Sequence, residues 1–249
     1  ALRSMLYYWV YVNELLKVGN YDLIFFSTTQ FPLCILGKYW KRKYGVPFVI
    51  DMQDPWHSNY YINKPKKERP PKYWFSYRLN KWLEPIAMNN CDGLMSVSQK
   101  YLSDLRVRYK SVQLKPNEVI TFGASTIDQK VAKKILTDYN VHKNEVVKTL
   151  LYIGRAGHDM RASLVSIFKA FKKGLNEDHD LFKQFQFKFL GTSYAPAGKS
   201  IKTVKPVAEK MGVGAYVTEQ TDRLGYFRSI GKLQGADGVI VPGSDDAGY

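Results

Sequence analysis

The sequence predicts an α/β protein built from two parallel-sheet domains. Short apolar runs, typical of strands buried on both faces, alternate with helix-like segments. The same pattern restarts at residue 149, after a polar connector over 124–148. Of the 249 residues, 45% are hydrophobic, which is enough for a large core.

The first half of the chain alternates helices with short strands. Residues 3–18 carry apolar positions at helical spacing, and Gly19-Asn20 ends that helix. Pro32 begins a second helix that Gly45 stops, and Ser98 is typical of an N-cap. The predicted helices are 3–18, 32–44, 72–90 and one that follows Ser98. The predicted strands are 22–27, 46–50, 93–97 and 119–122.

The second half repeats the alternation. Its predicted helices are 126–139, 163–174, 203–211 and 224–233, and its predicted strands are 149–153, 185–190, 216–217 and 238–241. Placing the boundary in the polar connector gives a first domain over 1–140 and a second over 145–249. In parallel sheets of this kind, ligands bind at the carboxyl ends of the strands. The residues that follow each strand are therefore the candidates for chemistry.

In the first domain, a buried strand leads directly into polar residues. Asp51, Asp54 and His57 follow this strand, with Trp56 among them. A carboxylate here could hold a sugar hydroxyl or accept its proton, and an imidazole could assist. The alternative is that both aspartates only cap loops through backbone N–H groups.

In the second domain, a Gly-Arg-x-Gly turn follows the first strand. Gly154 and Gly157 permit close approach of a ligand, and the next helix N-terminus favours phosphate. Arg155 and Arg161 could clamp a diphosphate, although Arg155 could equally be an ordinary surface arginine. The turn matches neither a Walker A loop nor a complete G-x-G-x-x-G signature.

Two further loops of the second domain have weaker signals. Gly191 begins a loop that could pass beneath a nucleotide, and Ser244 could donate a hydrogen bond to phosphate. Both loops could also be plain turns. No metal site is predicted, because the four histidines are scattered and no C-x-x-C pair occurs.

The net charge of +15 favours an anionic partner. Residues 38–81 combine eleven Lys/Arg and three Asp/Glu with eleven aromatic residues. This mixture suits peripheral contact with an anionic membrane, and it could also stack single-stranded nucleic acid. The alternative is that the rings belong to the core and the lysines only solubilise the surface. No apolar run approaches the length of a membrane span.

Several of these segments together resemble the GT-B glycosyltransferases, and most of all their family 4. In the first domain, the resemblance rests on Tyr21-Asp-Leu-Ile, on Gly45-Val-Pro-Phe-Val-Ile-Asp-Met-Gln-Asp-Pro-Trp56 and on Cys91-Asp-Gly-Leu-Met-Ser-Val-Ser98. In the second, it rests on Leu151-Tyr-Ile-Gly-Arg155, on Gly225-Tyr-Phe and on Ala236-Asp-Gly-Val-Ile-Val241. The order and spacing of these pieces carry the resemblance.

The resemblance implies two Rossmann-like domains with a cleft between them, and a metal-independent transferase that needs no cofactor. The second domain would hold a nucleoside-diphosphate-sugar donor, and the first a saccharide or lipid-linked acceptor. Arg155 matches the diphosphate-contacting arginine of the family, and Arg161 lies near its usual lysine. The family's glycine-rich first loop and its Glu-x7-Glu element are not found, so we expect each domain to be incomplete.

These observations predict a glycosyltransferase of polysaccharide biosynthesis at the cytoplasmic face of the membrane. Asp54 and His57 would be catalytic, and Asp51 and Trp56 would contact the acceptor. The donor would be held by Gly154, Arg155, Arg161, Gly191 and Ser244. Two alternatives stay open: a sugar-nucleotide epimerase or phosphorylase of the same fold, and a non-enzymatic membrane- or nucleic-acid-binding module. The hypothesis of a nucleic-acid-binding module is disfavoured, because it leaves the repeated strand–Gly–helix units unexplained.

Overall fold

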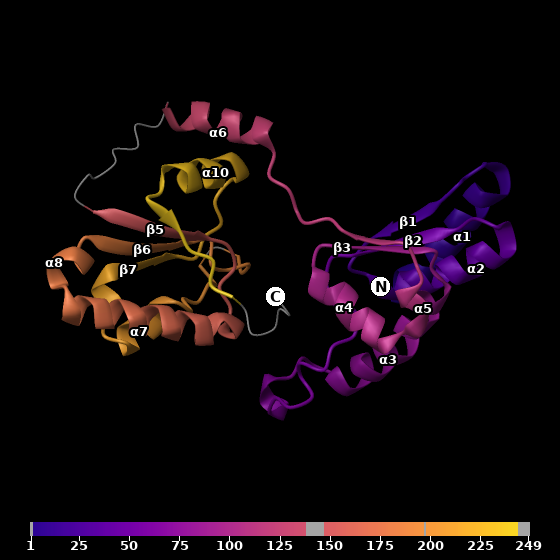
Figure 1. The fold of residues 1–249 in the computed structure, drawn as a ribbon, viewed down its shortest axis with the longest axis horizontal. Coiled ribbons are helices and arrows are strands. Elements are labelled where there is room, and N and C mark those ends of the chain that lie inside the picture. Colours follow the sequence, from indigo (N-terminus) through magenta and orange to yellow (C-terminus); the bar gives the residue numbers. More distant parts are fainter. Residues whose placement is uncertain (1, 138–146, 197, 244–249) are drawn as a thin grey trace. The chain divides into compact units, whose positions relative to one another are not determined.

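A computed structural model describes residues 2–137, 147–196 and 198–243 of the chain. The chain forms two compact units, one up to Gly123 and the other from Ala124 onward (Figure 1). The fold of each unit is described by itself.

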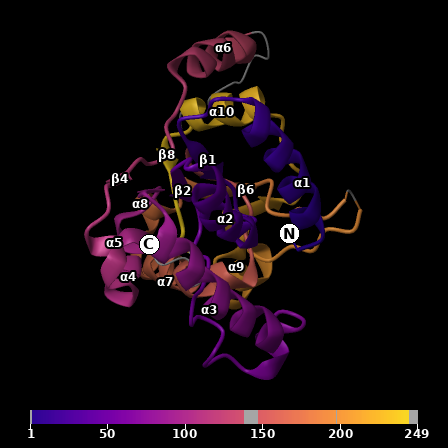
Figure 2. The same ribbon diagram turned by 90° about the vertical axis from the view of Figure 1, so that its right-hand side faces the viewer.

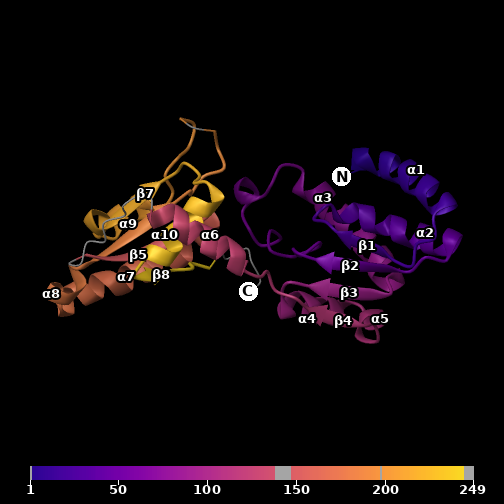
Figure 3. The ribbon, with the colours of Figure 1, turned by 90° about the horizontal axis from the view of Figure 1, so that it is seen from above.

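The first unit contains a four-stranded parallel sheet. Its strands are β1 (Ile24–Ser27), β2 (Phe48–Met52), β3 (Gly93–Ser96) and β4 (Asn117–Val119), and they lie in that order across the sheet (Figure 3). The register pairs Ser27 with Asp51 and Met52 with Ser96. The polar residues that end β1, β2 and β3 therefore lie at one edge of the sheet.

Five helices and two short 3-10 turns accompany this sheet. They are α1 (Leu2–Val18), η1 (Phe31–Cys34), α2 (Ile35–Tyr44), η2 (Lys66–Glu68), α3 (Tyr73–Asn90), α4 (Gln99–Arg108) and α5 (Lys110–Gln113). Gly45 ends α2 in the left-handed conformation at φ 75°, and the Ser98 hydroxyl caps α4 by accepting from the Lys100 amide.

One face of the first sheet forms the core. Phe48, Ile50 and Leu94 are at most 2% exposed and pack against α2, α3, α4 and α5, which lie on one side of the sheet in Figure 1. On the other face, Phe25 is 49% exposed and Met95 is only half-buried. The expectation of strands buried on both faces is therefore wrong for β1, whose residues alternate between half-buried and exposed.

The second unit also contains a four-stranded parallel sheet, in the order β7-β6-β5-β8. The strands are β5 (Lys148–Ile153), β6 (Phe185–Leu190), β7 (Val217–Gln220) and β8 (Gly238–Val239). Phe187 and Phe189 on β6 pack against Phe168 and Phe171 of α7 (Arg161–Glu177) to form the core. The carboxyl ends of these strands lead into the predicted donor loops.

The remaining elements of the second unit are helices and two 3-10 turns. They are α6 (Thr126–Thr137), η3 (His158–Met160), α8 (His179–Phe182), α9 (Lys205–Lys210), η4 (Gly214–Tyr216) and α10 (Tyr226–Gly235). Figures 1 and 2 both show α10 between α6 and the sheet. The Tyr226 hydroxyl donates to Asp128 at 2.9 Å, which ties α10 to α6. The predicted range 1–140 would place α6 with the first domain, whereas its contacts lie in the second unit.

The predicted α/β fold class with two parallel sheets is confirmed. Several strands have shifted bounds. The largest shifts are in β2, which lies at 48–52, in β4, which lies at 117–119, and in β7, which continues to Gln220. Among the described residues, no helix is long and apolar enough to cross a bilayer.

Candidate functional site

The carboxyl edge of the first sheet brings together the ends of β1 and β2. The Ser27 hydroxyl donates to Asp51 Oδ2 at 3.0 Å, and the side-chain amide of Gln53 donates to the same oxygen at 2.9 Å. The Gln53 amide also donates to Ser27 Oγ at 2.9 Å. Asp51 is thus oriented by Ser27 at the end of the adjacent strand β1 and by Gln53, which directly follows β2.

Asp54 and Trp56 have opposite surroundings, although they lie two residues apart. Asp54 is exposed, yet partial desolvation raises the pKa of its carboxyl above the ordinary value. Trp56 is 5% exposed, stacks on Phe31 at 5.6 Å and donates from Nε1 to Asn80 at 3.2 Å. In this structure Asp54 is available to a ligand, whereas Trp56 packs in the core.

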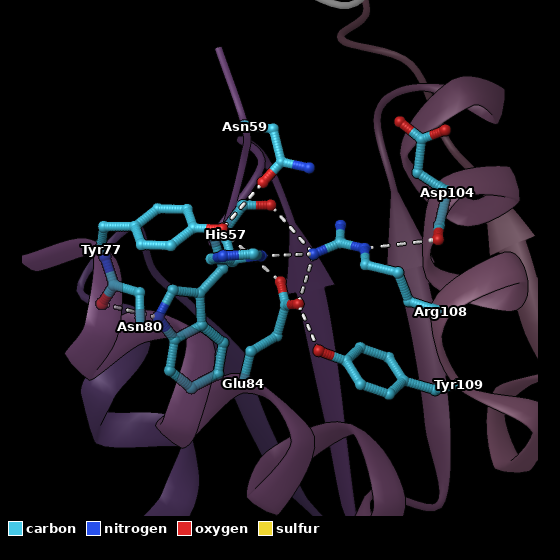
Figure 4. A network of polar contacts seen from close by, with 9 residues as sticks. His57, Asn59, Tyr77, Asn80, Glu84, Asp104, Arg108 and Tyr109 are labelled. Carbon is cyan, nitrogen blue, oxygen red and sulfur yellow. Dashed lines mark hydrogen bonds and ion pairs between the residues drawn. The ribbon is translucent and has the colours of Figure 1, made fainter. Parts of the chain in front are cut away.

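His57 lies in a polar network around the fully buried Glu84 (Figure 4). Glu84 accepts from the His57 amide at 3.2 Å, from Arg108 at 2.5 Å and from the Tyr109 hydroxyl at 2.6 Å. Burial raises the pKa of Glu84, outweighing the opposing effect of these donors. The network joins the loop after β2 to α3 and to the end of α4.

The network also places a cation against the His57 ring. Arg108 Nη1 lies 3.2 Å from Nδ1, and the same nitrogen donates to the His57 carbonyl at 2.9 Å and to Glu84 at 2.5 Å. Burial, followed by the charges of Arg108 and Lys81, lowers the pKa of His57. The Nε2 atom of His57 is buried and makes no hydrogen bond to the described residues.

Sequence reasoning missed Glu84, Arg108 and Tyr109. One signal could have found Glu84, since it stands alone in the apolar run Trp82-Leu-Glu-Pro-Ile-Ala87 of a predicted helix. A carboxylate at a core position needs partners. Its partners lie 24 and 25 residues further on, where sequence offers no indication of pairing.

In the second unit, Arg155 follows β5 at the predicted turn and pairs with Asp159. Its two terminal nitrogens donate to the two carboxylate oxygens at 2.9 and 2.6 Å, a bidentate arrangement that raises the pKa of Arg155. The Tyr152 hydroxyl donates to the Arg155 carbonyl at 2.7 Å. A Cβ at Gly157 would lie 2.0 Å from Arg155 Nη1, so a larger residue there would displace the ends of this ion pair.

Arg161 lies at the start of α7, beside a small cavity of about 100 Å³. Lys202 and Lys210 line the same cavity, together with Gly157, His158 and Thr203. Three cationic side chains thus surround a space next to the Gly154–Gly157 loop. The cavity is suited to an anionic group.

Gly191 and Glu219 shape the loop that follows β6. Gly191 has φ 72°, in the left-handed region that favours glycine. Glu219 is 8% exposed and accepts four hydrogen bonds, from the Thr192 hydroxyl and from the amides of Thr203, Val204 and Lys205. The Thr203 hydroxyl donates to the Ala156 carbonyl at 2.7 Å, which ties this loop to the Arg155 turn. Glu219 was not predicted from the sequence.

The other predicted features of the site have simpler outcomes. Ser244 lies outside the described residues. Within the described ranges, no group of three or more His, Cys, Asp or Glu residues is arranged to hold a metal ion.

Comparison with solved structures shows a GT-B glycosyltransferase fold. The N-terminal domain of Candida albicans trehalose-6-phosphate phosphatase matches with a TM-score of 0.62 and 11% identity, over 100% of this chain and 56% of that one. A UDP-forming trehalose-phosphate synthase from Burkholderia xenovorans matches with a TM-score of 0.59 and 10% identity, over 94% and 55%. Anabaena Alr3699/HepE in complex with UDP-glucose matches with a TM-score of 0.52 and 13% identity, over 92% and 55%.

The model of Glycosyltransferase Family 4 matches residues 1–126, and the chain belongs to this family. No match was found among curated protein sequences. The chain spans a little over half the length of the structures it resembles.

Proposed function

We propose that this protein transfers a sugar from a nucleoside-diphosphate-sugar donor to a saccharide or lipid-linked acceptor. The observation that carries the proposal is the turn after β5, where glycines, a helix N-terminus and Arg155 gather at the carboxyl edge of a parallel sheet. HepE, which has the same fold, is described in complex with UDP-glucose. The family membership of the chain supports the same class of reaction.

On the donor side, the diphosphate would bind at the loops after β5 and β6. Gly154 and Gly191 would let the phosphates approach the backbone, while Arg155 and Arg161 neutralise them. Negative charge grows on the departing diphosphate, so guanidinium groups held nearby stabilise the transition state more than the ground state. Ser244 would add a hydroxyl donor.

On the acceptor side, Asp54 is the proposed base. It is exposed, and its raised pKa brings it closer to the value that favours proton transfer at neutral pH. His57 is the second proposed catalytic residue, and contacts with Glu84 and Arg108 hold its loop in place. Asp51 would contact acceptor hydroxyls beside Ser27.

We further propose that the reaction needs no metal ion and takes place at the cytoplasmic face of an anionic membrane. The first point is supported by the resemblance to GT-B enzymes, for which metal dependence is not expected. The second is supported by the basic and aromatic composition of residues 38–81.

A donor assay tests the proposal. The natural polypeptide that carries this chain is incubated with labelled uridine- and guanosine-diphosphate sugars and candidate acceptors, with and without a chelator. We expect donor-dependent transfer that survives chelation. Arg155→Ala should lower kcat by roughly a hundredfold or more, while Arg228→Ala on the exposed side of α10 serves as the matched control.

Other outcomes would point to the alternatives. An epimerised sugar or a sugar phosphate formed without an acceptor would indicate an epimerase or phosphorylase. Absence of donor binding, together with salt-sensitive binding of single-stranded RNA, would indicate a nucleic-acid-binding module and refute the transferase proposal.

A further inference from the structure

The solvent-exposed face of α3 carries an unusual set of side chains. Trp74 and Trp82 are both 66% exposed, and Phe75 is 48% exposed. Arg78 and Lys81 are exposed between them. The spacing of these five residues, at positions 74, 75, 78, 81 and 82, places them on one face of the helix. Together they form a single stripe, called here the α3 stripe.

The opposite face of α3 anchors the helix in the core. Leu83, Ala87 and Met88 are at most 2% exposed and pack in the cluster formed with the first sheet. Because the helix already packs on the sheet through this buried face, the stripe is not needed for the core and is left exposed to solvent. Of the five tryptophans in the chain, Trp40 and Trp56 are the deeply buried ones, at 2% and 5% exposure.

The two interpretations of residues 38–81 can now be separated. Within this segment, the rings of Trp40 and Trp56 belong to the core, whereas those of Trp74 and Phe75 face solvent, as does Trp82 directly after it. Large apolar side chains gathered on a surface are typical of an interaction site.

The charge around the stripe is strongly positive. Residues 57–82 contain seven basic residues and one acidic residue, Glu68. Four of the cations, Lys64, Lys66, Lys67 and Arg69, precede the helix in the loop that Figure 3 shows before α3. Lys72, Arg78 and Lys81 flank or belong to the stripe. Arg78 also lies 5.9 Å from the Trp74 ring, which keeps a cation beside an aromatic surface.

We propose that the α3 stripe docks on the headgroup region of an anionic lipid bilayer. Indole rings settle at the membrane–water interface, where the apolar body is buried and the N–H stays hydrated, while arginine and lysine meet anionic headgroups. The exposed Ile62 of the preceding loop adds a further apolar contact. A membrane occupant is favoured because the stripe pairs bulky apolar rings with cations on one side of a helix. The stripe deepens the proposed function by naming the surface that would hold the enzyme near a lipid-linked acceptor.

Vesicle binding tests this proposal directly. The protein is mixed with vesicles of phosphatidylglycerol and phosphatidylcholine, or of phosphatidylcholine alone, and bound protein is measured by flotation without any sugar donor. We expect binding to the anionic vesicles, a blue shift of tryptophan fluorescence, and loss of binding at high salt. Trp74→Ser with Trp82→Ser should lower the partition coefficient at least tenfold, and Arg78→Gln with Lys81→Gln should lower it roughly tenfold or more.

The matched control is Tyr7→Ser on α1. Tyr7 is 80% exposed on the first unit but lies outside the stripe, so its replacement should leave vesicle binding unchanged. Circular dichroism of each variant verifies folding. Equal binding of the wild type and the tryptophan variant to anionic vesicles would overturn the proposal. A tryptophan variant that loses binding to single-stranded RNA but keeps binding to vesicles would also overturn it. Because no donor is present, failure here is distinguishable from failure of the donor assay.

Discussion

Replacing Glu219 by glutamine probes how the second unit holds its donor loops. The carboxylate accepts two hydrogen bonds on each oxygen, from the Thr192 hydroxyl and the Thr203 amide on one and from the Val204 and Lys205 amides on the other. A glutamine side chain has one oxygen and one NH2 group. Two donors would therefore face another donor and lose their acceptor.

The structure sets the size of the effect. Hydrogen bonds to charged groups contribute about 1.5–3 kcal/mol each, and a buried donor left unpaired also loses its hydration. Two such losses at a side chain that is 8% exposed give roughly 3–6 kcal/mol of destabilisation. This is a large share of the roughly 5–15 kcal/mol that holds a typical domain together.

The position of the tryptophans provides a selective assay. All five, at positions 9, 40, 56, 74 and 82, lie in the first unit, so indole fluorescence reports its unfolding alone. Far-ultraviolet circular dichroism reports both units. We expect Glu219→Gln to move part of the dichroism transition to lower urea and to leave the fluorescence midpoint unchanged.

The matched control is Glu209→Gln, on the exposed side of α9 in the same unit. It should change the transition by less than about 0.5 kcal/mol. A Glu219→Gln variant that unfolds like the wild type would refute the assigned role of the carboxylate. An equal shift in fluorescence and dichroism would contradict the separation into two units.

Three further perturbations test other contacts. Gly191→Ala places a side chain at φ 72° and should cost about 1 kcal/mol in the dichroism transition of the second unit; an unchanged transition would contradict this. Asp159→Asn releases Arg155 and removes a negative charge, so the affinity for UDP by calorimetry should rise roughly threefold to tenfold, and weaker binding would count against the loop as the diphosphate site. Because burial raises the folded-state pKa of Glu84 above its unfolded value, its contribution to stability is largest in acid and is lost as pH rises through the folded pKa. As pH rises from the unfolded-state to the folded-state pKa of Glu84, the wild type should therefore lose stability relative to Glu84→Gln. Urea unfolding followed by fluorescence at several pH values measures this difference. A relative gain in stability over that pH range would contradict the direction of the pKa shift.

Local signals in the sequence predicted most of the fold. Gly45 ends α2 in the left-handed conformation, Ser98 caps α4 and the phenylalanine-rich segment 185–190 forms β6, because each of these features depends on a few neighbouring residues. The exposed side of β1 was not predicted. Phe25 has the apolar character of a buried strand residue, and its exposure depends on which helices cover that face of the sheet.

The candidate site was predicted only in part for the same reason. Strand ends identified Asp51 and Arg155, since parallel strands deliver their last residues to one edge. The partners of these residues come from elsewhere: Ser27 and Gln53 orient Asp51, and Asp159 engages Arg155. The buried glutamates of both units organise loops that are distant in sequence, and only the folded chain shows which donors they serve.

The central claim is that the loops after β5 and β6 hold the diphosphate of a nucleotide sugar. Hydrogen–deuterium exchange of the natural polypeptide with and without saturating UDP tests it most directly. We predict slower exchange confined to the peptides that cover 154–161 and 191–194, and its loss in Arg155→Ala. Protection by UDP that falls outside these loops, or protection there that survives Arg155→Ala unchanged, would contradict the account.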